Sequence, residues 1–307
     1  MQIIPDVRTT EANFPNVVLT VGSFDGVHLG HQCILKEIAE LAEQLKGTPA
    51  VLTMHPHPRE FFSPAHAPNL LTSNAKKFQL FDAFGVEVTY ILPFDQETAN
   101  IEAETFVREI LCRRCHVSAM LVGYDFRFGK DAKGDFELLT RMGAELGFEV
   151  RQISALVIEA ERVSSTLVRE RVLQGDLDRV ESLLGRKYSL VGVVVTGRGR
   201  GAEIGFPTAN IKPHHNAVPA QGVYIAEALI NGDRRPTAVN IGVAPTIRQE
   251  DLTIEAHILD YSEDLVGAEI EIVFHKRIRS EKKFSSIDEL VAQIARDVTA
   301  TRDYFKA

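Results

Sequence analysis

The stretch VGSFDGVHLGHQ, residues Val21–Gln32, decides the fold of the first half of the chain. It follows a short apolar run rich in β-branched residues, Val17–Val21, and leads into a segment with leucine and isoleucine at helical spacing up to Leu45. A strand that passes through a glycine-containing turn straight into a helix opens a strand–helix–strand unit. We therefore predict a parallel sheet that begins here, with a ligand at the carboxyl end of this strand.

Strand and helix patterns continue to alternate as far as residue 185. Ser164 or Ser165 is the expected N-cap of a helix that starts near Leu167. This alternation is typical of a doubly wound α/β domain, in which helices cover both faces of a parallel sheet. The predicted strands are Val51–Met54, Val86–Leu92, Ala119–Val122 and Glu149–Ile153, and the predicted helices are Ala75–Phe84, Ala103–Leu111, Phe136–Leu146, Leu167–Leu173 and Leu177–Leu184.

The second half of the chain has a different period. Short β-rich runs separated by Gly, Pro, Asn or Asp turns indicate a β-sandwich or a β-barrel. A last amphipathic stretch, Ser286–Tyr304, predicts a terminal helix. We place the domain boundary so that residues 1–185 form one domain and residues 186–307 form the other. The predicted strands of the second domain are Leu190–Thr196, Gly222–Ile230, Pro236–Ile241, Thr253–Asp260 and Glu269–Arg277.

Charge and cysteine content argue against several classes of protein. Residues 1–185 carry 18 Lys and Arg against 26 Asp and Glu, and residues 186–307 carry 16 of each, so neither half has the basic excess of a nucleic-acid binder. No apolar run reaches the roughly 18 residues of a membrane span, and the opening MQIIPDVRTT lacks the pattern of a secretory signal. Cys33, Cys112 and Cys115 are expected to be reduced thiols in a cytoplasmic protein, and CRRCH at 112–116 matches a haem-attachment pattern by chance.

The Val21–Gln32 stretch also carries the first candidate centre for chemistry. His28 and His31 are three residues apart and would share a helix face, with Gly30 leaving room between them for a phosphate oxygen. Unpaired N–H groups at a helix start attract phosphate, and two imidazoles there can stabilise charge that grows on it during a reaction. The alternative is that both histidines only cap or pack at the helix start.

A glycine-rich loop, Gly197–Asn210 with the sequence GRGRGAEIGFPTAN, is the second candidate centre. Its alternating glycines let backbone N–H groups approach phosphates closely. It lacks the Gly-Lys-Ser/Thr ending of a Walker loop, and we predict no helix after it. A plain hairpin turn is the usual alternative for such a loop, and the segment GFPTAN at residues 205–210 is what makes a phosphate site the more specific interpretation.

The first half resembles the FMN adenylyltransferase domain of bacterial bifunctional riboflavin kinase/FAD synthetases. The resemblance rests on Val21–Gln32, which carries the HxGH signature of the nucleotidyltransferase superfamily, and on Pro56–Pro58, Val122–Gly129 and Val163–Arg169. It implies that the FMN phosphate attacks the α-phosphate of ATP directly, with His28 and His31 as catalytic residues. It further implies ATP contacts by Gly22, Phe24, Asp25, Gly30, Ser164, Ser165, Thr166 and Arg169, and flavin contacts by His57, Asp125, Phe126 and Phe128.

The second half resembles riboflavin kinases, of which GFPTAN is the hallmark. The resemblance implies that Thr208 and Asn210 hold Mg²⁺, that Asn210 also acts in catalysis, and that Glu255 accepts the proton of the ribityl 5′-hydroxyl of riboflavin. Arg279 is expected to hold flavin or phosphate, with a solvated surface charge as the alternative. The implied ATP contacts are Gly197, Gly199, Arg200, Gly201, Gly205 and Pro207, and the later matching segments are Gly222–Tyr224, Asn240–Gly242 with Pro245 and Thr246, Ile254–Asp260 and Ile278–Phe284.

Together the resemblances cover nearly the whole chain. They imply an N-terminal doubly wound nucleotidyltransferase domain and a C-terminal antiparallel β-barrel riboflavin kinase domain with a terminal helix. They also imply an enzyme that uses ATP and Mg²⁺ to convert riboflavin to FMN and FMN to FAD. The expected partners are these small molecules, without nucleic acid or membrane, and the oligomeric state is left open between a monomer and a weak homo-oligomer. A chain with one active half and a flavin-binding regulator without turnover are the alternatives.

Four positions depart from the family pattern. His55 stands where many relatives carry Asp, and Met54 stands where Phe is common, which puts flavin packing and local charge in question. Ala202 replaces a residue that is often basic, so one phosphate contact is in question. Val266 replaces a usual Tyr, which alters local packing.

Overall fold

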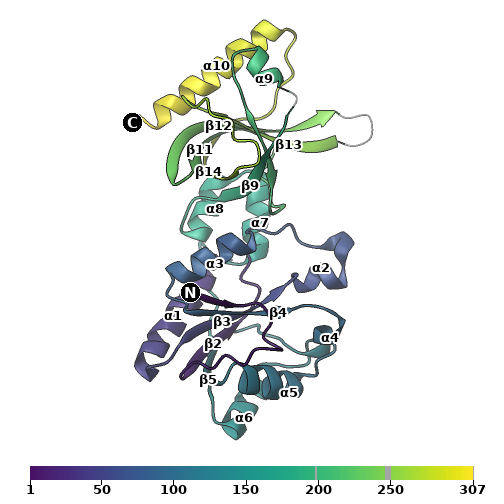
Figure 1. Ribbon diagram of the computed structural model, residues 1–307, viewed down its shortest axis with the longest axis vertical. Coiled ribbons are helices and arrows are strands. Elements are labelled where there is room, and N and C mark those ends of the chain that lie inside the picture. The colour runs from purple at the N-terminus through teal and green to yellow at the C-terminus, as the bar shows by residue number, and fades with distance from the viewer. Residues whose placement is uncertain (198, 246–249, 307) are drawn as a thin grey trace. The chain divides into compact units, whose positions relative to one another are not determined.

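The computed structural model describes residues 1–197, 199–245 and 250–306, with the backbone alone at residues 244, 245, 250 and 251. Two compact units form, one from Met1–Pro68 and Asn74–Ser165 and the other from Asn69–Ser73 and Thr166–Ala307 (Figure 1). The predicted boundary after residue 185 is not the division between these compact units. It stays a prediction about where the two functional domains meet.

The first unit is built on a six-stranded sheet in which every pair of neighbours is parallel. The strand order is β1-β4-β3-β2-β5-β6, so that β2 lies between the strand that follows it, β3, and the later strand β5. The predicted parallel sheet is confirmed, with the short first strand as an unpredicted addition at the edge. The strands are β1 (Gln2–Ile4), β2 (Val17–Val21), β3 (Pro49–His55), β4 (Val88–Pro93), β5 (Val117–Gly123) and β6 (Glu149–Ile153).

The sheet presents alternate residues to two apolar layers. In β2, Val17 and Leu19 belong to one buried cluster and Val18 belongs to the other, as the alternation of side chains along a strand requires. Helices pack against both clusters, so the predicted doubly wound arrangement is confirmed (Figure 1). The helices are α1 (Leu29–Leu45) and α3 (Asn74–Ala83) on the Val18 face, and α5 (Ala103–Thr105), η2 (Phe106–Arg114) and α6 (Phe136–Leu146) on the Val17 face.

The segment after α5 is a π-helix, whereas the sequence predicts an ordinary α-helix over Ala103–Leu111. Phe106, Val107, Ile110 and Leu111 on this helix still belong to one buried cluster, as residues four apart on a helix do. The i+5 hydrogen bond from Cys115 N to Ile110 O, 2.9 Å long, closes the helix. The remaining short elements of this unit, all too brief to show a sequence period, are α2 (Pro58–Phe62), η1 (Pro64–His66), α4 (Gln96–Ala99), η3 (Lys130–Ala132), β7 (Val157–Ile158) and β8 (Glu161–Arg162).

The second unit is a closed antiparallel barrel of six strands in the order β10-β13-β12-β11-β14-β9. Closure leaves no sheet edge unpaired. Of the two architectures that the sequence allows, a sandwich or a barrel, the structure shows the barrel. Tyr224 and Phe274 are buried inside it and meet edge to face, with ring centroids 5.5 Å apart. The strands are β9 (Ser189–Val195), β10 (Ala209–Pro213), β11 (Gly222–Ile230), β12 (Asp233–Pro245), β13 (Glu250–Ile258) and β14 (Glu269–Arg279).

Four helices accompany the barrel strands: α7 (Ser165–Gln174), α8 (Leu177–Leu184), α9 (Arg200–Glu203) and α10 (Ile287–Tyr304). α10 is the predicted terminal helix, and Ser286 caps it by accepting a hydrogen bond from Glu289 N. The prediction of no helix after the glycine-rich loop Gly197–Asn210 is confirmed, because strand β10 follows it, but the loop itself contains the short helix α9. It is a single turn that starts after Gly199, at φ 73°, and one turn is too short to produce a periodic pattern. Among the described residues, no helix combines the length and apolar character that a bilayer crossing demands.

Candidate active sites

The carboxyl ends of β2 and β5 form the reversal point of the parallel sheet, because the chain continues from β2 to one side and returns on the other. A pocket of about 260 Å³ opens there, between these strand ends and the start of α1. Most of the residues predicted for ATP in this half come together in it. The predicted ATP contacts that line it are Gly22, Phe24, Gly30, Ser164 and Ser165, and they are joined by the predicted catalytic residues His28 and His31 and by the predicted flavin contacts Asp125 and Phe126.

The two histidines lie face to face at the entrance of α1. Their rings are stacked, with centroids 3.7 Å apart and planes inclined by 16°. His28 is not on the helix face as predicted. It is the N-cap, in extended backbone, and its Nδ1 accepts a hydrogen bond from His31 N at 3.2 Å. The capping interpretation is therefore correct for His28, but capping and a position in the pocket occur together.

The His31 ring is enclosed on several sides. Its centroid lies 4.7 Å from that of Phe24, and its Nδ1 atom is buried without a hydrogen-bond partner in the described part of the chain. Burial, the neighbouring His28 and the charge of Lys77 lower the pKa of His31 well below 6.5. At neutral pH this imidazole is uncharged and can still donate one hydrogen bond.

The loop before His28 is held in an uncommon backbone conformation. Phe24 has φ 50° and Val27 has φ 41°, with Gly26 at 81° between them. The Asp25 side chain is 4% exposed, and the Asp25 carbonyl oxygen accepts a hydrogen bond from Ser165 Oγ at 2.8 Å. Ser165 thus ties the second motif of this half to the first, and the predicted ATP contact of Asp25 stays a prediction.

Sequence reasoning missed Arg162, which lines the same pocket. Its Nη2 donates to Asp125 Oδ2 at 2.6 Å, and its guanidinium lies 4.4 Å from the ring centroid of Tyr124. Arg162 sits on the two-residue strand β8, next to the Val163–Arg169 motif. That adjacency was the only available signal.

A second, more apolar pocket of about 480 Å³ adjoins the first, and Val21 and Phe126 line both. Phe126 and Phe128 are stacked in its wall, with centroids 5.4 Å apart. Met54, one of the positions that depart from the family pattern, also lines it, so that departure falls where flavin packing was in question. Other large apolar residues line it as well, and periodicity alone does not distinguish them from core residues: Phe62, Leu92, Phe94, Ile101 and Phe106.

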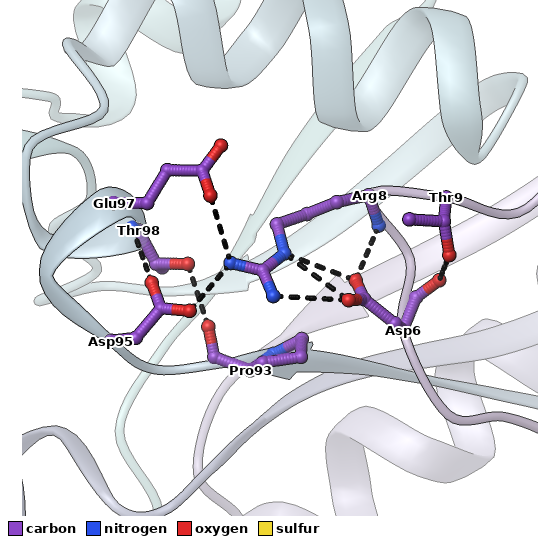
Figure 2. Close-up of polar contacts among 7 residues, drawn as sticks. All are labelled: Asp6, Arg8, Thr9, Pro93, Asp95, Glu97 and Thr98. Atoms are coloured by element: carbon purple, nitrogen blue, oxygen red, sulfur yellow. Dashed lines mark hydrogen bonds and ion pairs between the residues drawn. The ribbon is translucent and has the colours of Figure 1, made fainter.

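One wall of the apolar pocket, residues 94–101, is held by Arg8 near the start of the chain (Figure 2). Arg8 Nη1 donates to Asp95 Oδ2 at 2.7 Å, and Arg8 Nη2 donates to Asp6 Oδ2 at 3.0 Å. Asp95 Oδ1 in turn accepts from Thr98 N at 2.9 Å and so caps α4. Glu97 adds a longer ion pair to Arg8 at 3.5 Å. Burial raises the pKa of Asp6, but the hydrogen bonds from Arg8 outweigh burial and lower it.

Four residues predicted for this half do not line the described pockets: Asp25 of the buried loop, His57, Thr166 and Arg169. His57 caps α2: its Nδ1 accepts from Arg59 N at 3.1 Å, and its backbone N donates to Glu60 Oε2 at 2.8 Å. Thr166 and Arg169 belong to the second compact unit, where Arg169 Nε donates to the Asn69 carbonyl oxygen at 2.7 Å. Their contacts with flavin or ATP stay predictions.

In the barrel, the glycine-rich loop and β10 form a pocket of about 320 Å³. Gly197, Gly199, Pro207, Thr208 and Asn210 line it, as predicted for phosphate and metal contacts. The Asn210 side chain lies directly against Gly197, where a Cβ atom would collide with its amide. A side chain at residue 197 would therefore have to displace the Asn210 amide.

Strand register brings the predicted base beside the predicted metal ligand. On β13, Glu255 pairs with Asn210 of β10 on one side and with Asn240 of β12 on the other. Directly paired residues project from the same face of a sheet. Glu255 lines a fourth pocket of about 290 Å³, and Thr208 lines both this pocket and the one at the glycine-rich loop.

The loop before β10 is fixed to β13 by a histidine. His257 Nδ1 lies 2.8 Å from the Pro207 carbonyl oxygen, and its ring meets Phe206 edge to face. A carbonyl oxygen only accepts, so Nδ1 carries the proton. Arg200 and Gly201 line the Glu255 pocket rather than the pocket at the glycine-rich loop. Gly205 lines neither of the two pockets, and its backbone is left-handed, with φ 88°.

Arg279 is largely buried rather than a solvated surface charge, and its contact with flavin or phosphate stays a prediction. It makes two hydrogen bonds from Nε, 3.2 and 3.0 Å long, and one from Nη2, 2.7 Å long, to the carboxylate of Asp297 on α10. The Asp297 side chain is 5% exposed, and Arg279 lines the Glu255 pocket from this fixed position.

Of the positions in this half that depart from the family pattern, Val266 lines the pocket at the glycine-rich loop, whereas Ala202 is exposed on α9. Arg198 and Thr246 of the matching segments lie outside the described residues.

The donor set at Thr208 and Asn210 fits Mg²⁺ better than zinc or iron. Within residues 1–197, 199–245 and 250–306, no group of three or more His, Cys, Asp or Glu side chains could hold a metal ion. Mg²⁺ characteristically takes only one or two protein oxygens and completes its shell with substrate phosphates and water. A hydroxyl and an amide oxygen beside a phosphate loop suit that mode of binding.

Comparisons with known proteins match a different family to each half of the chain. Family models match in two places, FAD synthetase over residues 10–167 and riboflavin kinase over residues 184–305. The bifunctional riboflavin kinase/FMN adenylyltransferase of Escherichia coli strain K12 is 38% identical, over 99% of this chain and 98% of that protein. The protein of the same name from Bacillus subtilis strain 168 is 34% identical, over 94% and 92%. A crystal structure from Streptococcus pneumoniae, described as a macrolide-efflux protein, superposes with a TM-score of 0.87 at 28% identity and covers 98% of both chains.

Proposed function

The chain belongs to the bifunctional riboflavin kinase/FMN adenylyltransferase family, and we propose which of its pockets serves each reaction. As a member, it phosphorylates riboflavin to FMN with ATP and transfers an adenylyl group from ATP to FMN, giving FAD and pyrophosphate. We assign adenylyl transfer to the paired pockets of the first unit and phosphorylation to those of the barrel. The observation that carries this assignment is that each unit has two adjoining pockets with shared lining residues.

In the first unit, ATP would occupy the pocket of His28 and His31, and the flavin ring would occupy the apolar pocket. Phe126 and Phe128 offer aromatic faces to the flat isoalloxazine. With the boundary at Val21 and Phe126, the FMN phosphate would approach the α-phosphate of ATP from the flavin side. A phosphate oxygen of FMN attacks the α-phosphorus, the bond to the β-phosphate breaks, and pyrophosphate leaves. The imidazoles donate hydrogen bonds to the charge that develops.

In the barrel, ATP would lie on the glycine-rich loop and riboflavin in the Glu255 pocket, with Thr208 at their boundary. Glu255 takes the proton of the ribityl 5′-hydroxyl as its oxygen attacks the γ-phosphorus, and ADP leaves. Thr208 and Asn210 would hold Mg²⁺, which when bound neutralises charge on the ATP phosphates. Arg279, fixed by Asp297, would orient riboflavin rather than follow the phosphate.

Separate assays test the assignment. The chain is incubated with ATP and Mg²⁺ and either riboflavin or FMN, and the flavins are separated by chromatography. We expect both FMN and FAD from the first incubation and FAD from the second. His31→Gln should abolish FAD formation while FMN formation continues at the wild-type rate. FAD formation that survives this substitution would place adenylyl transfer elsewhere, and a wild-type chain that yields a single product would mean that one half is inactive.

A further inference from the structure

A lysine is buried beside the paired histidines and has no place in the reaction as assigned. Lys77, on α3, is 6% exposed, and its Nζ donates to the Ser23 carbonyl oxygen at 3.1 Å and to Thr53 Oγ1 at 3.3 Å. Both acceptors are neutral, and lysine is almost never fully buried unless it is paired with an opposite charge. Asp25 and Glu60 attract this cation, but its burial still costs stability, and its presence points to a role in function.

The carbonyl that Lys77 holds belongs to the strained loop. Ser23 comes just before the left-handed residues Phe24, Gly26 and Val27, and the loop runs directly into His28. Strained backbone of this kind persists only where its surroundings fix it. Thr53 Oγ1 also donates to the Ser23 carbonyl oxygen, at 3.4 Å, so β3 and α3 hold the loop from two directions.

Lys77 also acts on the histidines through its charge. Of the groups that face His31, Phe24 is apolar, His28 is titratable, and Lys77 is a cation. Burial lowers the pKa of Lys77 to about 8, although Asp25 and Glu60 oppose that change. Lys77 is therefore charged at neutral pH, and a second positive charge on His31 would be repelled.

We propose that Lys77 is a positioning residue for adenylyl transfer, which fixes the Ser23–Val27 loop that leads into His28. This inference rests on the proposed placement of that reaction at His28 and His31. A neutral His31 keeps the same hydrogen-bonding pattern over the physiological pH range. Burial is the main reason that the pKa of His31 is low, and His28 and Lys77 lower it further, so the site resists proton uptake where an ordinary histidine would titrate.

The test removes the charge with and without the hydrogen-bond donor. Lys77→Gln keeps a donor for the Ser23 carbonyl, and Lys77→Met removes both. We expect FAD formation in the full-length chain to fall about tenfold in kcat for Gln and about a hundredfold for Met, with the KM for FMN unchanged. Lys36→Met, which removes an exposed lysine of α1, is the matched control and should match the wild type. Riboflavin phosphorylation reports that each chain is otherwise intact.

A titration separates this role from a merely structural one. The ring proton signal of His31, assigned by its disappearance in His31→Gln, should titrate at higher pH in Lys77→Gln than in the wild type. The kcat of Lys77→Gln for FAD formation should begin to fall at a higher pH than that of the wild type. An unchanged His31 titration with wild-type kcat in Lys77→Gln would refute the role of Lys77, even if Lys77→Met does not fold. If His31→Gln itself forms FAD normally, the placement of the reaction fails instead.

Discussion

The two loops that we propose to bind phosphate hold their polar groups by different means. In the first unit, the loop before α1 is buried, strained at Phe24 and Val27, and fixed by groups from β3, α3 and Ser165. In the barrel, the glycine-rich loop is largely exposed. The proposed metal ligand Asn210 and the proposed base Glu255 lie opposite each other on paired strands. The first site depends on a shell of buried contacts around it, whereas the second depends on strand register.

The two sites should therefore respond differently to amino-acid substitution. A buried shell couples each polar group to several others, so a change at one position disturbs more than one function. Register is set by the whole barrel and survives the replacement of a single side chain. We therefore expect an isosteric substitution in the barrel site to lower the reaction rate without changing the fold. In the first unit, a substitution must keep the structural contacts of the residue if its effect on the reaction rate is to be measured.

The largest expected effect is at Glu255. Glu255→Gln keeps the shape of the side chain and the register with Asn210 and Asn240, but it cannot accept the proton of riboflavin. We expect riboflavin phosphorylation to fall about 10²–10⁴-fold in kcat, with FAD formation from FMN unchanged. Glu269→Gln is the control, because it makes the same change at an exposed glutamate on another barrel strand, β14. Equal rates for both variants would remove Glu255 from the role of base.

The next effect separates capping from catalysis at His28. Asparagine is a good N-cap, so His28→Asn keeps the start of α1 while the imidazole is lost. We expect FAD formation to fall about 10²–10³-fold, comparable to the loss of one donor to a developing charge. The melting temperature and the kinase rate should stay at wild-type values. His66→Asn, at an exposed histidine of the same unit, is the control. Normal FAD formation by His28→Asn would leave His28 with the capping role alone.

Much of this arrangement can be predicted from the sequence, and the failures have physical causes. The alternation around Val21–Gln32 predicts the parallel sheet, and GFPTAN marks the barrel site, because both are local patterns. Lys77 was not predicted, because a lysine in an amphipathic helix is ordinarily a surface residue. The pairing of Asn210 with Glu255 depends on strand register, and β10 was hidden in a segment interpreted as loop. Arg8 and Asp95 are 87 positions apart in the sequence, and no local pattern connects them.

The smallest expected effect is at Arg8, whose contacts hold the 94–101 wall of the apolar pocket from outside (Figure 2). The ion pairs are partly exposed, so their loss costs about 1 kcal/mol, and Arg8→Met should raise the KM for FMN about fivefold with little change in kcat. Hydrogen bonds from Thr98 N and from Arg8 lower the pKa of Asp95, and that of Asp6 is lowered as well. Stability from lowered carboxyl pKa values is present above the ordinary carboxyl pKa, 3.8, and is lost only as pH falls below it.

The KM difference between Arg8→Met and the wild type should therefore be constant from about pH 8 to pH 5. Arg113→Met, which removes an exposed arginine paired with Glu109 on η2, is the matched control and should leave the KM for FMN at the wild-type value. A KM for FMN that Arg8→Met leaves unchanged would show that the apolar wall keeps its shape without this tie. Because the barrel receives no contribution from Arg8, riboflavin phosphorylation should be unaffected in either variant, so the two sites can be perturbed independently.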